Sequence, residues 1–123
     1  MIDPLLTEWD YGDYEGVTTG EIRAKRPGWE LWIDGCPGGE SPDAVLRRAR
    51  SFLARLDLED GDVLVFSHGH FIRALALAFL GLAAAAGAHF ALDTATVSVL
   101  RAGDRGHLVQ VWNAGEHLPG ARR

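Results

Sequence analysis

One junction constrains the fold of this chain more than any other feature, because an apolar run passes through four polar or small residues into a second apolar run. The first run is Val-Leu-Val-Phe at residues 63–66, the connection is Ser-His-Gly-His at residues 67–70, and the second run begins at Phe71. Four consecutive bulky apolar residues after an Asp-Gly-Asp turn are typical of a strand buried on both faces. The pattern therefore predicts a buried strand, a tight turn and a helix, as in an α/β fold.

His68 lies at the end of the predicted strand, where open α/β sheets form their ligand crevices. Gly69 lets a ligand approach the backbone closely, and the free N–H groups at the start of the helix favour an anion. Arg73, about one turn into the helix, adds positive charge. A histidine at a strand end can also be a simple hydrogen-bonded side chain, but these neighbours together favour a phosphate site.

The composition limits the class of protein. The chain has 123 residues, 47% of them hydrophobic and 24% charged, which suits one globular domain over residues 1–123. A net charge of -5 argues against nucleic acid or an anionic membrane as partner, since both require a basic face. The longest apolar stretch, residues 74–86, is too short to span a bilayer. With one cysteine, Cys36, and no features of a signal peptide, we expect a cytoplasmic protein without an internal disulfide.

Capping signals predict two further helices. Thr18 or Thr19 can cap a short helix that runs to about Arg26. Ser41 followed by a proline and an acid predicts the start of a longer helix. Its apolar residues recur on one face and its arginines are expected on the opposite, solvated face: Val45, Ala49, Phe52, Leu53 and Leu56 against Arg47, Arg48, Arg50 and Arg55.

The end of the chain predicts a β-hairpin. Residues 96–101 and 107–112 are rich in apolar residues and flank an Ala-Gly-Asp-Arg-Gly turn. Between the junction and this hairpin, the helix that begins near Phe71 is expected to end near Gly81 or Gly87. The order of elements is therefore loop, helix, loop, helix, strand, helix and hairpin.

Two other chemistries fit parts of the sequence. Ser67 before a His-Gly pair is similar to the nucleophile turn of serine hydrolases, and Asp93 with His107 or His117 would complete a triad in the usual order. The turn requires glycine two residues before the serine, and Val65 stands there. A lone Ser67 hydroxyl more simply satisfies a backbone group at the strand end.

A metal site is the second alternative. His68 and His70 form an H-x-H pair, which metal-dependent hydrolases use. A zinc site requires at least a third convergent ligand. Asp10 or Asp13 could serve, but neither stands at a spacing typical of such sites. The sequence therefore gives the metal interpretation little support.

Four segments, taken together and in order, carry a more specific signal. They are Leu-Thr-Glu-Trp-Asp-Tyr-Gly-Asp-Tyr-Glu-Gly at 6–16, Pro-Gly-Gly-Glu-Ser at 37–41, Phe-Ser-His-Gly-His-Phe-Ile-Arg at 66–73 and Trp-Asn at 112–113. With them the chain resembles the histidine phosphatases, or phosphoglycerate-mutase-like superfamily, over nearly its whole length. The resemblance implies a three-layer α/β domain with a mainly parallel sheet, flanking helices and a C-terminal hairpin strand.

The resemblance also implies roles for particular residues. Glu8 corresponds to the proton donor for the leaving group, and His68 to the second histidine of the phosphate pocket. Ser67, Gly69 and His70 are candidate phosphate- or substrate-binding residues, although His70, two positions beyond His68, is expected to point toward the helix and the core or its rim. The implied substrate is a small phosphorylated compound, phosphatase chemistry is favoured over mutase chemistry, and no metal or cofactor is required.

The family's attacking group is absent from these 123 residues. In the family, a histidine of an Arg-His-Gly motif at the end of the first strand attacks phosphorus and becomes phosphorylated, and no Arg-His pair occurs here. We therefore expect that this chain lacks the family's N-terminal strand and helix and is inactive alone. We expect the complete form of the protein to be a phosphomonoester hydrolase. Two explanations of the missing segment stay open. The start codon was placed too late or the chain is a cloned fragment, or the chain is a natural noncatalytic remnant that binds phosphate ligands or proteins. Exposed sheet edges favour a homodimer in both cases.

Overall fold

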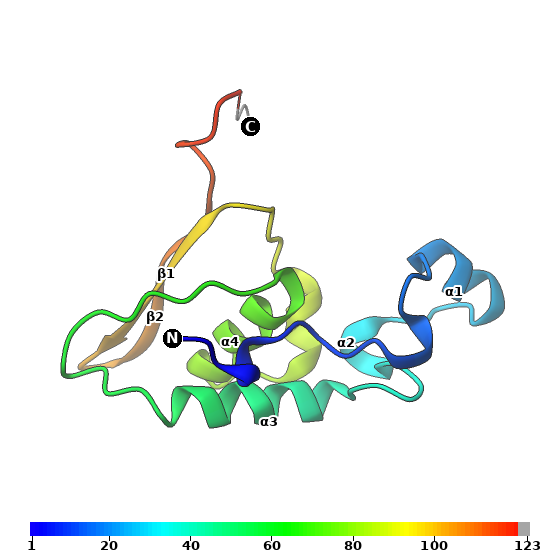
Figure 1. Cartoon of the computed structure of the whole chain (residues 1–123), viewed down its shortest axis with the longest axis horizontal. Helices are drawn as coiled ribbons and strands as arrows, with labels where there is room; N and C mark the ends of the chain where they lie inside the picture. Colours follow the sequence, from blue (N-terminus) through cyan, green and yellow to red (C-terminus); the bar gives the residue numbers. More distant parts are fainter. Residues whose placement is uncertain (121–123) are drawn as a thin grey trace.

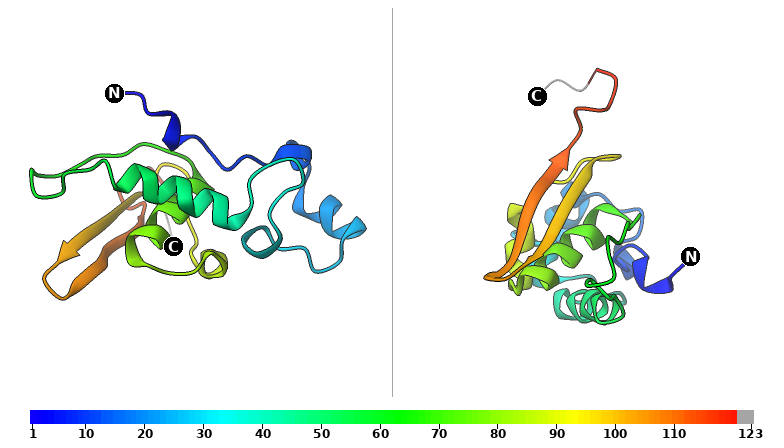
Figure 2. Two further views of the ribbon diagram at one scale, coloured as in Figure 1. Left: turned by 90° about the horizontal axis from the view of Figure 1, so that it is seen from below. Right: turned by 90° about the vertical axis from the view of Figure 1, so that its left-hand side faces the viewer.

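The structure is a computed structural model that describes residues 1–120. Figures 1 and 2 show helices α3 and α4 side by side, with the β1–β2 hairpin and helix α1 toward opposite ends of the long axis. In chain order the elements are the short 3-10 turns η1 (Pro4–Leu6) and η2 (Gly12–Tyr14), α1 (Thr19–Lys25), α2 (Leu31–Asp34), α3 (Pro42–Leu53), α4 (Gly69–Leu80), η3 (Ala84–His89), β1 (Val97–Gly103) and β2 (Gly106–Ala114).

The predicted helix ends are confirmed by their caps. Thr18 and Glu21 form a reciprocal capping box at the start of α1. Ser41 accepts a hydrogen bond from the backbone N–H of Ala44 at 3.1 Å and starts α3. Gly81 ends α4 in the left-handed region, at a φ of 71°, which glycine adopts without a steric cost.

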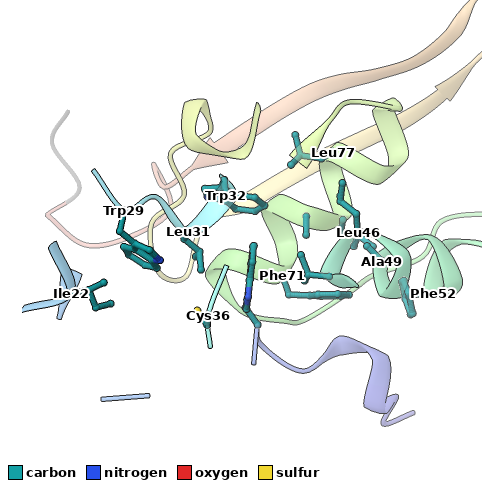
Figure 3. Packing of buried hydrophobic residues seen from close by; sticks show 14 residues of the cluster. Ile22, Trp29, Leu31, Trp32, Cys36, Leu46, Ala49, Phe52, Phe71 and Leu77 are labelled. Atoms are coloured by element: carbon teal, nitrogen blue, oxygen red, sulfur yellow. The ribbon is translucent and has the colours of Figure 1, made fainter. Parts of the chain in front are cut away.

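The core lies between α3, α4 and a group of tryptophans from the loops and from α2. Figure 3 shows these side chains converging between α3, α4 and α2. Val45 and Phe71 are completely buried, and Trp9 stands edge-on to Trp32 with 5.0 Å between the ring centroids. Burying a large apolar side chain stabilises the fold by roughly 1.5–3 kcal/mol. The tryptophans thus anchor the N-terminal loop and α2 on the two long helices.

The hairpin is confirmed, and it makes the sheet of the described chain. β1 and β2 pair antiparallel, with Val99 opposite Val111 and Gly103 opposite Gly106 at the turn. The predicted C-terminal hairpin and the helices that precede it are therefore present. Among residues 1–120, no helix is both long and apolar enough to cross a membrane.

The segment at residues 63–66 corrects one expectation. It follows an irregular path without strand pairing, and its Leu64 and Phe66 side chains are 79% and 82% exposed, whereas we expected a strand buried within a mainly parallel sheet. A strand needs the N–H and C=O groups of a neighbour. Within residues 1–120 the sheet consists of β1 and β2 alone, so no described segment supplies those groups. The apolar run is present, but its pairing partner is not among the described residues.

The loop that carries Glu8 packs tightly against the segment after Cys36, and one glycine makes this possible. A Cβ atom on Gly39 would lie 2.2 Å from the carbonyl oxygen of Asp10 and 2.6 Å from the backbone nitrogen of Gly12. We expect Gly39→Ala to lower the free energy of unfolding by about 1–3 kcal/mol, because backbone must move. Urea unfolding measures this loss.

Gly20→Ala is the matched control. Gly20 lies within α1, and the nearest atom to an added Cβ is 4.0 Å away. Alanine favours a helix over glycine by about 1 kcal/mol. Gly20→Ala should therefore not lower the free energy of unfolding. Equal free energies of unfolding in Gly20→Ala and Gly39→Ala would contradict the close packing of the loops.

Candidate active site

The carboxylate of Glu8 lies against the first turn of α4. Its Oε1 accepts a hydrogen bond from the backbone N–H of Phe71 at 2.9 Å, and its Oε2 accepts one from that of His70 at 3.2 Å. The first N–H groups of a helix have no partner within the helix, and the helix dipole favours negative charge there. Glu8 thus occupies the place where the sequence predicted a bound anion.

Arg48 corrects the prediction of a solvated arginine face on α3. Its side chain is 15% exposed, and its Nε and one Nη donate to the two carboxylate oxygens of Glu40, each at 2.8 Å. Arg48 follows Val45 by three residues and precedes Phe52 by four, so it lies beside the buried stripe of the helix. This spacing was the signal that the sequence analysis missed.

Glu40 shapes the loop around Glu8. One of its carboxylate oxygens accepts from the backbone N–H of Asp10 at 2.9 Å, and its backbone oxygen accepts from the indole N–H of Trp9 at 3.0 Å. Burial raises the pKa of the Glu40 carboxyl, but the hydrogen bonds from Arg48 and Asp10 outweigh this and hold the pKa below its usual value. The carboxylate therefore remains charged and keeps its partners.

His70 packs among aromatic side chains, as its position two residues after His68 predicted. Its Nδ1 shares a hydrogen bond of 2.5 Å with the hydroxyl of Tyr11 and lies 4.0 Å from Oε2 of Glu8. The ring of Trp9 stands edge-on to it. Burial lowers the pKa of His70. Burial, followed by the charge of Glu8 and a hydrogen bond with it, raises the pKa of Tyr11. The imidazole and the phenol are therefore both neutral near pH 7.

His68, Ser67 and Gly69 lie on the outer side of this turn. The side chain of His68 is exposed and faces an open hollow of about 300 Å³, which Phe66 and the first residues of the chain also line. The hydroxyl of Ser67 donates to the carbonyl oxygen of Leu6 at 2.7 Å, and no atom approaches a Cβ built on Gly69 within 4 Å. The backbone around His68 is thus open to a ligand.

Arg73 does not join His68. One of its Nη atoms donates to the carbonyl oxygen of Gly87 at 2.5 Å, and its guanidinium lies 5.0 Å from the centroid of the Trp32 ring. With His70 it lines a second hollow of about 330 Å³. The structure therefore brings Glu8 to the turn that contains His68, while His70 and Arg73 face a different hollow.

The alternative chemistries are not assembled in the described chain. Ser67, His107 and His117 each bond a different backbone carbonyl, those of Leu6, Phe79 and Ala95 in that order. Across residues 1–120, no group of three or more His, Cys, Asp or Glu side chains is placed to hold a metal ion.

The half-buried imidazole of His70 makes stability depend on pH. Because the pKa of His70 is lowered in the folded chain, the unfolded chain takes up a proton at a higher pH. The folded state should therefore lose stability as pH falls below about 6.5, the ordinary histidine value. We expect His70→Gln to reduce the loss between about pH 7.5 and about pH 5.5, measured by urea unfolding at each pH. His89→Gln, at an exposed histidine, is the control, and the same pH dependence in His70→Gln and the unmodified chain would contradict the account.

Comparison with known proteins places this geometry in a family. The model of the histidine phosphatase superfamily (branch 1) matches residues 1–115. An acid phosphatase of Mycobacterium tuberculosis is 47% identical over 97 residues, which cover 77% of this chain and 48% of that protein. Sedoheptulose 1,7-bisphosphatase of Saccharomyces cerevisiae is 35% identical over 100 residues, 67% of this chain and 36% of that protein.

A solved structure gives the same result. The protein of the Mycobacterium tuberculosis open reading frame Rv3214 superposes with a TM-score of 0.84 and 43% identity, covering 91% of this chain and 59% of that one. The chain spans about half the length of the acid phosphatase and a smaller part of the yeast enzyme. These similarities confirm the predicted α/β fold class and the resemblance found in the sequence. The chain belongs to the histidine phosphatase superfamily.

Proposed function

We propose that this chain carries part of the active site of a phosphomonoester hydrolase that works through a phosphohistidine. In this proposal Glu8 is protonated in the complex with the phosphate ester, whose negative charge favours the neutral carboxyl, and it donates that proton to the leaving group. His68 donates hydrogen bonds to the phosphate oxygens. The observation that carries it is the Glu8 carboxylate fixed to the amides of residues 70 and 71, directly after the exposed His68. The acid phosphatase among the relatives supports the same reaction.

Phosphoryl transfer needs three things from a protein: an in-line nucleophile, positive charge on the equatorial oxygens and a proton for the departing oxygen. Glu8 supplies the proton and His68 contributes to binding the oxygens. The attacking histidine is not among these residues, because no Arg-His pair occurs in the 123 residues. We therefore expect the chain alone to bind phosphate without turnover, and a form that also supplies an Arg-His-Gly segment to hydrolyse phosphate esters.

We further propose a small phosphorylated substrate in the cytoplasm, without nucleic acid as a partner. One relative is a sedoheptulose 1,7-bisphosphatase, which supports a small phosphorylated compound. The net charge of -5 disfavours polyanionic partners. Ser67 and Gly69 remain candidate substrate contacts at the open turn around Gly69, whereas His70 could contact a substrate only from the other hollow, which it lines.

We expect Glu8→Gln to slow the hydrolysis of phosphate esters by an amount that depends on the leaving group. In the form of the protein that supplies the attacking histidine, kcat for an alkyl phosphate should fall about 10²- to 10⁴-fold, because the alkoxide requires a proton as it leaves. With p-nitrophenyl phosphate the loss should be much smaller, because its phenolate leaves without one. Steady-state kinetics with both esters measure the two losses.

Two controls accompany this experiment. His68→Ala should slow both esters, since His68 binds the phosphoryl group that they share, and the chain alone should hydrolyse neither. Equal losses for the two esters in Glu8→Gln would contradict the role of Glu8 as proton donor. Turnover that survives His68→Ala would overturn the assignment of the phosphate site.

We also propose that the chain forms a homodimer through residues 63–66. Leu64 and Phe66 are 79% and 82% exposed on a segment without strand pairing, and its unpaired backbone groups are open to pairing with a second copy of the chain. Sedimentation equilibrium should give about twice the chain mass of 13.3 kDa. Leu64→Lys should restore the monomer, while Ile33→Lys, at an exposed residue of α2, should not. A monomer at all concentrations of the unmodified chain would rule out the dimer.

A further inference from the structure

Arg48 reaches from α3 to the loop that carries Glu8 and binds its backbone. One Nη donates to the carbonyl oxygen of Leu5 at 2.8 Å and to that of Thr7 at 2.7 Å. The other Nη donates to the carbonyl oxygen of Glu8 itself at 3.2 Å. Three backbone carbonyls from residues 5–8 therefore converge on one guanidinium from a helix some forty residues later.

The rest of the guanidinium is also occupied. Its remaining two N–H groups donate to the carboxylate of Glu40, and its Cζ atom lies 4.3 Å from the centroid of the Phe71 ring. An arginine has five N–H donors in a fixed planar arrangement, and here all five meet a carbonyl or carboxylate oxygen, with the Thr7 hydroxyl as a further acceptor at 3.4 Å. The same guanidinium thus touches the backbone of Glu8 on one side and, through Phe71, the first turn of α4 on the other.

We propose that Arg48 is a positioning residue for Glu8: from its place over the Phe71 ring, its guanidinium fixes the backbone of residues 5–8 so that the carboxylate meets the amides of His70 and Phe71. Without these hydrogen bonds, the backbone oxygens of the loop would turn toward water, and Glu8 would leave the start of α4. The catalytic consequence, delivery of a proton by Glu8, rests on the proposed function. The positioning itself does not.

Lysine cannot substitute for Arg48 in this role. Its ammonium has three donors on one atom, so it cannot hold the three carbonyls and both oxygens of Glu40 together. Arg48→Lys keeps the positive charge and the apolar stem but should release the loop. A role confined to charge or to packing would instead be restored by lysine.

Amide hydrogen exchange of the chain, followed by NMR, tests the positioning directly. In Arg48→Met and Arg48→Lys, the amides of His70 and Phe71 should exchange about 10- to 100-fold faster relative to the amide of Leu77 in the same helix. Arg47→Met, at the neighbouring exposed arginine, should leave this ratio unchanged. Val45→Ala, which weakens the core beside Arg48, controls for general loss of stability and should speed all three amides together.

An unchanged exchange ratio in both Arg48 variants, or full protection in Arg48→Lys, would overturn the proposal. Arg48→Lys also provides the test if Arg48→Met does not fold.

Kinetics give a second readout. In the form that supplies the attacking histidine, the variants should slow the hydrolysis of an alkyl phosphate at least about tenfold more than that of p-nitrophenyl phosphate, as expected for an effect through Glu8. If the His70 and Phe71 amides exchange faster in the Arg48 variants but no form of the protein hydrolyses phosphate esters, the positioning is supported and the proposed function is refuted. If these amides exchange unchanged in a protein that hydrolyses phosphate esters, the proposed function is supported and the positioning is refuted.

Discussion

The contact between the Glu8 carboxylate and the amino end of α4 is the interaction on which the rest of the site depends. It joins the start of the chain to a helix sixty residues later, and it satisfies amides that the helix itself leaves free. Arg48, Glu40 and the buried Trp9 also hold the loop, and this contact fixes the position of the carboxylate itself. Because the carboxylate lies at the turn that contains His68, the same contact sets where a proton donor stands relative to a phosphate group bound there.

The hydrophobic core holds the two segments that make this polar contact. Trp9, the residue after Glu8, is almost fully buried and packs against Trp32, while Phe71 is completely buried on the other side of the contact. Glu40 accepts from the indole N–H of Trp9 and the backbone N–H of Asp10, and its carboxylate is bound by Arg48 of α3. Together these contacts leave His70 half-buried among aromatic side chains, where the neutral imidazole is favoured and its hydrogen bond to Tyr11 persists.

Local signals predicted more of this protein than long-range ones. Ser41 and Thr18 marked helix starts because a capping side chain acts within three residues. The pairing of residues 63–66 could not be derived in this way, since a strand depends on a neighbour that its own sequence does not specify. Glu8 was predicted through family resemblance, but its amide partners were not. Arg48 was misplaced because the helical pattern was divided into apolar and charged residues, although its spacing from Val45 and Phe52 placed it beside the buried face.

A double-mutant cycle between Arg48 and Glu8 tests the central claim most directly. The exchange rate of the Phe71 amide is measured in the chain, in Arg48→Met, in Glu8→Gln and in the double variant. If Arg48 protects this amide by positioning Glu8, the double variant should exchange at nearly the rate of Glu8→Gln alone, so that the two effects are strongly non-additive. Effects that multiply independently would show that Arg48 and Glu8 act separately and would contradict the account.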